Sequence, residues 1–179
     1  DPGSAIVNGS ATSNTYTITG TSLSSATVTP NPTTVSSAAA YNLQFSVGSS
    51  GALTAGSGTI TFIYPSNTTV PASMAASNVT VNGTLLSISP TTDSGTRTIT
   101  ITTPVNISNS GSVTVVFNSG AGLINPSSAG NTYLLTVNTS VETSPVSSNA
   151  YSITTANQVS NASVTLTDAQ RNASTVLYD

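Results

Sequence analysis

Apolar and polar side chains alternate along several short stretches of this chain, and this pattern constrains the fold more than any other feature of the sequence. Between residues 41 and 47 every second residue is apolar, from Tyr41 to Val47. A period of two places such residues on one face of a β-strand. The pattern recurs in four further stretches, which are Ile60–Tyr64, Ile99–Ile101, Val113–Phe117 and Tyr133–Val137. Each stretch is therefore expected to form a strand with one buried face.

The firmest local prediction is a β-hairpin at Asn82-Gly83. These two residues readily adopt the positive φ values of a two-residue hairpin turn. The turn would join a strand over Val79–Val81 to one over Leu85–Ile88.

A second turn is expected at Asp93-Ser94-Gly95, between strands over Leu85–Ser89 and Thr96–Thr102. Only Pro71–Ser77 suits a helical turn. Closely spaced strands, together with few helix-forming Glu, Lys or Arg residues, predict an all-β fold. We expect an Ig-like or pilin-like antiparallel β-sandwich with an extra terminal strand segment.

Few side chains in this chain can do acid–base or metal chemistry. Of 179 residues, two are Arg and five are acidic, and Lys, His, Cys and Trp are absent. Without His, Lys or Cys there is no base for a serine nucleophile and no thiolate. Five scattered acids do not provide the clustered oxygen ligands of a calcium site. We expect no enzymatic activity, no catalytic or metal-binding residues and no cofactor.

The charge balance also bears on partners and location. A formal net charge of −3 offers no basic surface for nucleic acid. No apolar run is long enough to span a bilayer, and the first residues, Asp1–Ser4, lack the features of a signal peptide. We expect a processed, secreted chain that binds no nucleic acid and does not insert into a membrane.

The two ends of the chain contain similar sequences. Ser13–Thr29 matches Ser148–Thr165 with an offset of 135 residues, which becomes 136 after a one-residue gap. This repeat predicts one whole unit, from about Ala26 to Thr155, flanked by strands of neighbouring units. The predicted organisation is an N-terminal extension over 1–22, a β-sandwich over 23–155 and a C-terminal strand segment over 156–179.

The terminal segments are predicted to pair with other copies of the chain. A spare strand exposes unpaired backbone groups, and this chain has no Lys with which to protect a sheet edge. Ala5–Thr19 is the preferred donor strand, with Ile6, Tyr16 and Ile18 as the inter-subunit residues. Ala162–Tyr178 is the competing donor.

One stretch resembles a repeat domain of prokaryotic cell-surface proteins. It comprises Gly120–Gly130 followed by Tyr133–Val137, and Pro65-Ser66, Asn78–Gly83 and Ser148–Tyr151 fit the same pattern. The resemblance covers roughly Ala26 to Thr155 and implies an extracellular β-sandwich module of a surface-layer, stalk or adhesin protein. The organisation also resembles archaeal thread-type filament subunits and donor-strand-complemented pilins.

Eight Asn-x-Ser/Thr sequons are candidate N-glycosylation sites, and an uncharged surface would gain solubility from glycans. They begin at Asn8, Asn67, Asn78, Asn82, Asn106, Asn138, Asn161 and Asn172. Composition alone would give roughly six, so the number is no evidence of modification.

These observations predict a structural subunit of an extracellular filament, a homopolymer joined head to tail by donor-strand complementation. The alternative is one repeat of a surface-layer or adhesin stalk that contacts carbohydrate or another cell. The tyrosines fall at apolar strand positions, so they are expected to pack in the core rather than to form a carbohydrate platform.

Overall fold

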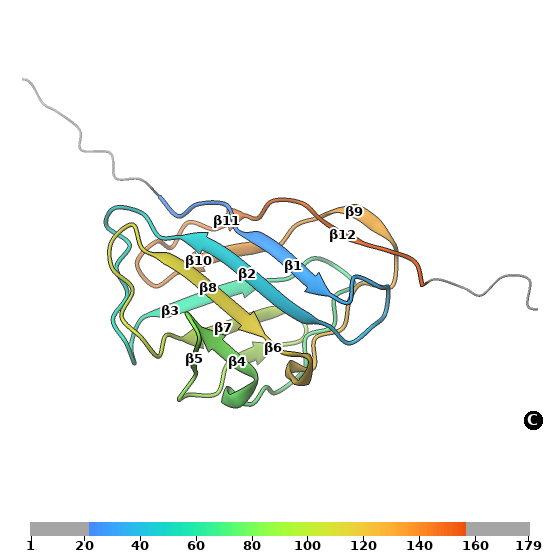
Figure 1. Ribbon diagram of the computed structural model, residues 1–179, viewed down its shortest axis with the longest axis horizontal. Helices are drawn as coiled ribbons and strands as arrows, with labels where there is room; N and C mark the ends of the chain where they lie inside the picture. The colour runs from blue at the N-terminus through green and yellow to red at the C-terminus, as the bar shows by residue number, and fades with distance from the viewer. Residues whose placement is uncertain (1–21, 157–179) are drawn as a thin grey trace, which may run out of the picture.

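Two five-stranded antiparallel sheets pack face to face in the computed structural model, which describes residues 22–156 (Figure 1). The first sheet has the spatial order β1 (Thr27–Asn31), β2 (Ala40–Ser46), β8 (Ser112–Phe117), β4 (Val79–Val81) and β5 (Thr84–Leu85). The second has the order β11 (Val146–Ser147), β10 (Thr136–Thr139), β3 (Thr59–Ile63), β7 (Thr98–Thr102) and β6 (Thr91–Asp93). The predicted all-β sandwich is thus confirmed.

A third, small sheet pairs β12 (Tyr151–Ile153) with β9 (Gly130–Tyr133). Two short 3-10 turns, η1 (Ala76–Asn78) and η2 (Ser119–Ala121), complete the regular structure of the described residues. The 3-10 turn η1 overlaps only the end of the stretch Pro71–Ser77, over which a helical turn was expected.

The core lies between the two large sheets and is built from the predicted alternating side chains. In β2, Tyr41, Leu43 and Phe45 are buried, whereas the intervening Asn42 and Gln44 are exposed. Ring contacts join the sheets, because Phe62 of β3 lies edge-on to Phe45 and Phe117 of the first sheet, at centroid distances of 6.4 and 5.7 Å. Each buried apolar side chain contributes about 1.5–3 kcal/mol of transfer free energy, so the sandwich has a substantial core of its own.

The predicted Asn82-Gly83 hairpin is present, with φ values of 50° and 79° at the two turn residues. Its second strand, β5, spans only Thr84–Leu85, so the strand expected over Leu85–Ile88 is wrong in length. Leu86 turns into the core while its neighbours Leu85 and Ile88 are exposed, because the chain crosses here from one sheet to the other.

Two other strand predictions need correction. The strand before the Asp93 turn is β6 (Thr91–Asp93), not Leu85–Ser89. The stretch Tyr133–Val137 is not one strand, because β9 ends at Tyr133 and β10 begins at Thr136. The chain changes sheets between them.

The first and last described residues, Ser22 and Ala156, lie at opposite ends of the long axis of the sandwich (Figure 1). The two residues therefore mark the ends of an elongated unit.

Candidate functional site

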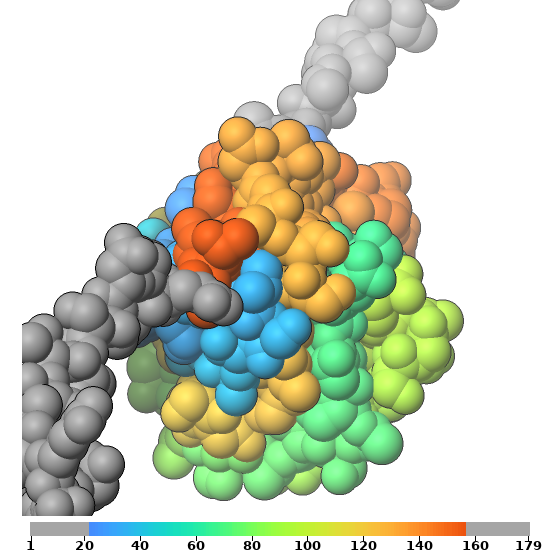
Figure 2. Space-filling view, turned by 90° about the vertical axis from the view of Figure 1, so that its right-hand side faces the viewer, coloured from blue at the N-terminus to red at the C-terminus, as the bar shows by residue number. Residues whose placement is uncertain are grey.

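The strand β12 occupies a position that we call the β12 slot, between β9 and the segment Thr33–Val35. On the β9 side, Tyr151 faces Tyr133 and Ile153 faces Gly130, with an irregular register between them. On the other side, Thr154 N–H donates to the Thr33 carbonyl at 2.8 Å, and Val35 N–H donates to the Thr154 carbonyl at 2.9 Å. Figure 2 looks onto this end of the molecule, where the orange-red surface of the β12 segment lies against the blue surface of the segment after β1.

The slot buries alternate side chains of β12. Tyr151 and Ile153 are 5% and 2% exposed, whereas Ala150 and Ser152 are exposed. The ring of Tyr151 packs edge-on against Tyr41, with the centroids 6.3 Å apart. The slot is therefore defined by two apolar anchors separated by one outward-facing residue.

The residues just before β12 are also fixed. Ser148 is buried, and its backbone N–H donates to the Leu135 carbonyl while its hydroxyl accepts from Leu135 N–H, at 2.8 and 3.1 Å. Asn149 N–H donates to the Ala26 carbonyl at 2.8 Å. These bonds connect the start of the β12 segment to the residue just before β10 and to the chain just before β1.

A cluster of buried polar groups lies beneath the slot. Tyr41 donates its hydroxyl to Oδ1 of Asn125 at 2.6 Å. The Asn125 amide then donates to the Pro32 and Thr34 carbonyls, at 2.8 and 2.9 Å. Since Thr34 belongs to the wall of the slot, Asn125 joins that wall to strand β2.

Burial raises the pKa of three tyrosines in this cluster, Tyr41, Tyr64 and Tyr151. Desolvation is the main cause for each, because burial disfavours the phenolate. The neighbouring phenols add to the effect at Tyr64. These tyrosines are core residues, as the sequence predicted, and are not a surface platform for carbohydrate.

Three hydroxyls of the cluster, those of Tyr64, Thr68 and Tyr151, are buried and make no hydrogen bond of standard geometry with a described residue. Thr68 and Tyr41 lie close enough to Tyr151 to affect the pKa of its phenol, but neither meets that geometry. The sequence contained no sign of this cluster, because the fold brings together residues far apart in the chain.

The candidate glycosylation sites differ in what their side chains do. Asn67 is exposed in a turn, and Asn106 is exposed with only its Oδ1 engaged, accepting from Ala55 N–H at 2.8 Å. Asn138 lies half-buried on the outer face of β10. In contrast, the amide nitrogens of Asn78 and Asn82 donate to the carbonyls of Gly120 and Ser112, at 2.8 and 3.3 Å. Asn8, Asn161 and Asn172 lie outside the described residues.

The predicted donor-strand residues Ile6, Tyr16 and Ile18 also lie outside the described residues, as does the competing segment Ala162–Tyr178. The counterparts of Tyr16 and Ile18 in the repeat, Tyr151 and Ile153, are described, and they belong to the unit's own β12.

The few charged side chains in the described range serve local structure. Asp93 Oδ1 accepts from Gly95 N–H and Thr96 N–H, at 2.9 and 3.1 Å, and the Thr96 N–H in particular lowers the pKa of the carboxyl. Arg97 donates from Nε to the Tyr64 carbonyl at 3.3 Å, so Asp93 and Arg97 each bond to backbone groups. Both oxygens of the Glu142 carboxylate accept from Gly48 N–H. Residues 22–156 contain no cluster of three His, Cys, Asp or Glu side chains that could hold a metal ion.

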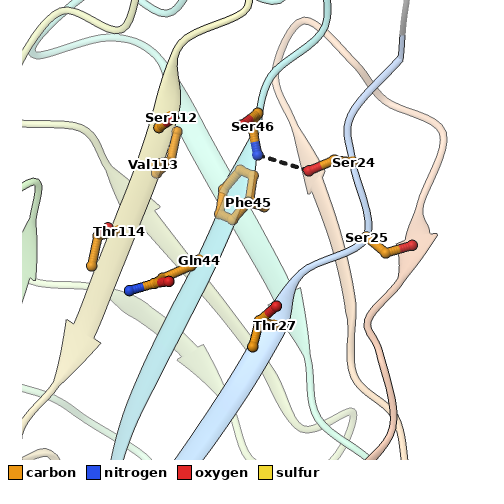
Figure 3. A pocket seen from close by; sticks show the side chains of 9 residues that line it. All are labelled: Ser24, Ser25, Thr27, Gln44, Phe45, Ser46, Ser112, Val113 and Thr114. Atoms are coloured by element: carbon orange, nitrogen blue, oxygen red, sulfur yellow. Dashed lines mark hydrogen bonds between the residues drawn. The ribbon is translucent and has the colours of Figure 1, made fainter.

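An open hollow of about 400 Å³ lies on the outer face of the first sheet, over β1, β2 and β8 (Figure 3). Gln44, Thr27 and Thr114 line it, and Ser46 N–H donates to Oγ of Ser24 at 2.8 Å on its rim. Its lining side chains are uncharged, and its one aromatic ring, Phe45, is 5% exposed. The hollow offers neutral hydrogen-bonding groups but no aromatic stacking surface.

Comparisons with known proteins find a likeness in fold alone. No protein-family model matches the chain, and no curated protein matches it. Among solved structures, the fold is similar to the crystal structure of BslA, described as a bacterial hydrophobin, with 17% identity and a TM-score of 0.47. The match covers 76% of this chain and 95% of that one. Within residues 22–156 no helix is long and apolar enough to cross a membrane.

Proposed function

We propose that this chain is a structural subunit of an extracellular filament in which β-sandwich units follow one another head to tail. One observation carries the proposal, namely the position of the repeat on the folded unit. The segment before Ser22 repeats the sequence that ends the unit, and the segment after Ala156 repeats the sequence that begins it. Because Ser22 and Ala156 lie at opposite ends of the long axis, neighbouring units would extend along one line (Figure 1).

The chemistry of the described surface supports a structural role rather than catalysis. The open hollow over the first sheet has an uncharged lining, and the few acids in the described range bond to backbone groups. Asn67 and Asn106 offer exposed positions for glycans, which would solubilise a surface with so few charges. The partner in this proposal is another copy of the same chain, and a donated strand makes the joint by donor-strand complementation.

A second candidate is one repeat of a surface-layer or adhesin stalk, joined to its neighbours through the backbone. The completeness of the unit favours this candidate. The core is closed by the unit's own β1 and β12, so no donated strand is needed to bury it. In such a stalk the uncharged hollow of Figure 3 would be the surface for a neutral polyhydroxyl ligand such as a glycan.

Negative-stain electron microscopy of the native material, with and without residues 1–20, tests the filament proposal. A chain that lacks residues 160–179 is the matched control of similar length. Filaments that disappear only with the N-terminal deletion support N-terminal strand donation. Filaments that disappear only with the C-terminal deletion would show that the C-terminal segment donates the strand. Absence of filaments from the intact native protein contradicts the proposal and favours the stalk.

A further inference from the structure

The side chains that are buried at the β12 slot, those of Ser148, Tyr151 and Ile153, are the same in the two copies of the repeat. Ser13–Thr19 and Ser148–Thr154 are identical at five of seven positions. The five correspond to Ser148, Asn149, Tyr151, Ile153 and Thr154.

Each of these five residues makes a contact in the slot. Tyr151 and Ile153 are the two buried anchors, and Ser148 is buried with both its backbone and hydroxyl bonded to Leu135. Asn149 and Thr154 form the backbone bonds to Ala26 and to the Thr33–Val35 segment.

The two positions that differ are both exposed, although the identical residues Asn149 and Thr154 are exposed as well. Ala150 and Ser152 face outward, and the N-terminal copy has Thr15 and Thr17 in their place. Threonine suits an exposed strand position because its β-branched side chain favours extended backbone. The segment Ser13–Thr19 therefore has every side chain that the slot uses.

We propose that the β12 slot of one copy binds residues Ser13–Thr19 of a second copy, with Tyr16 and Ile18 in the places of Tyr151 and Ile153. This inference rests on the proposed filament and specifies its joint. It is narrower than donation by the whole of Ala5–Thr19, because Ile6 lies outside the matching segment.

The position of β12 in the fold makes the exchange feasible. The strand belongs to neither large sheet, and it pairs with β9 at two residues and with Thr34 through one bridge. Its replacement would leave all ten strands of the two large sheets paired. The unit's own β12 competes at a high effective concentration, so the exchange is expected at high protein concentration or during assembly.

A cysteine trap tests this joint in the full chain, which has no cysteine of its own. The hydroxyls of Thr33 and Thr154 lie 3.2 Å apart across the edge of the slot. Thr33→Cys with Thr154→Cys should therefore form a disulfide within one chain, and it is the control for geometry. Thr33→Cys with Thr19→Cys is the test, because Thr19 is the counterpart of Thr154.

A disulfide between positions 19 and 33 cannot close within one folded chain. Three residues from Thr19 to Ser22 reach roughly 10 Å at most, and a disulfide spans roughly 6 Å more. The strand β2, whose two ends pair with Ser24 and Asn31, separates these residues by roughly 20 Å. A disulfide in the test variant must therefore join two copies.

The expected result is a ladder of disulfide-linked copies of the test variant on a non-reducing gel, after concentrated protein is refolded under oxidising conditions. Adding Ile18→Ser should remove the ladder, and adding Ile6→Ser should leave it. A test variant that stays monomeric, while the control forms its internal disulfide, overturns the inference. So does a ladder that survives Ile18→Ser. Filaments seen by microscopy without this disulfide would leave the filament proposal standing and reject this joint alone.

Discussion

Tyr41 donates its hydroxyl to Asn125 at 2.6 Å, between residues 84 positions apart in the sequence. Tyr41 lies near the start of β2 in the first sheet, and Asn125 lies in the loop after η2. The Asn125 amide also donates to two carbonyls of the segment that follows β1. One buried side chain thus holds a core strand, a loop and one wall of the β12 slot together.

Asn125→Ala should lower the free energy of unfolding by about 3 kcal/mol. The substitution leaves the buried Tyr41 hydroxyl without its partner, at a cost of roughly 1–3 kcal/mol, and it removes two part-buried hydrogen bonds to the carbonyls of Pro32 and Thr34, worth roughly 1 kcal/mol each. Urea unfolding followed by tyrosine fluorescence gives the value. The matched control is Asn42→Ala, on the exposed face of β2, which should change stability by no more than about 0.5 kcal/mol. Equal effects of the two substitutions would show that the Asn125 hydrogen bonds contribute little.

High pH should unfold the protein through its buried tyrosines. The folded-state pKa of Tyr41, Tyr64 and Tyr151 is raised above the ordinary value of 10.0. Their contribution to stability is therefore fully present below pH 10 and is lost as pH rises above it. Each tyrosine that ionises only on unfolding costs about 1.4 kcal/mol of stability per pH unit.

Unfolding free energies measured between pH 8 and 12 test this expectation. The free energy of unfolding should stay constant to about pH 10 and then fall. The steepest slope should correspond to the release of up to three protons on unfolding. Tyr64→Phe should reduce that slope by about one proton. A flat profile to pH 12 in the unsubstituted chain would contradict the role of the buried phenols.

Low pH should have little effect on stability, because the chain has only five acidic side chains to protonate. Asp93 contributes to the small change in stability, since hydrogen bonds from Thr96 and Gly95 lower its folded-state pKa. The contribution of Asp93 to stability is present above pH 3.8, the ordinary pKa of its carboxyl, and is lost as the pH falls below that value. Melting temperatures at pH 7 and pH 2 should differ little, and Asp93→Asn should reduce the difference further. A large drop at pH 2 would be the opposite result.

Glycosylation in the native source should favour Asn67 and Asn106 over Asn78 and Asn82. The first two expose their amide nitrogen, whereas the amide nitrogens of the other two donate to backbone carbonyls. Mass spectrometry of native peptides measures the occupancy of each site. Occupancy of Asn78 or Asn82 with Asn67 and Asn106 unmodified would show that these contacts do not govern modification.

Local patterns predicted the strands well and their junctions poorly. The alternation of Tyr41 to Val47 reports directly which side chains face the core, and Asn82-Gly83 encodes its turn through its own φ preferences. The division at Leu134 between β9 and β10 has no such signal, because an apolar alternation looks the same whether or not the chain changes sheets.

The site was predictable only in part, for a related reason. The repeat identified Tyr16 and Ile18 as strand residues with counterparts in the unit, and the structure shows the slot those counterparts fill. Asn125 could not be identified, since its role depends on partners that only the tertiary fold supplies.

The arrangement of units along one axis is the central claim, and the axial repeat of the native assembly tests it most directly. Cryo-electron microscopy of that assembly should show fibres one unit wide, with one copy per repeat and the Ala156 end of each unit next to the Ser22 end of the following one. Units packed side by side in a sheet, or isolated units in the native material, would contradict the claim.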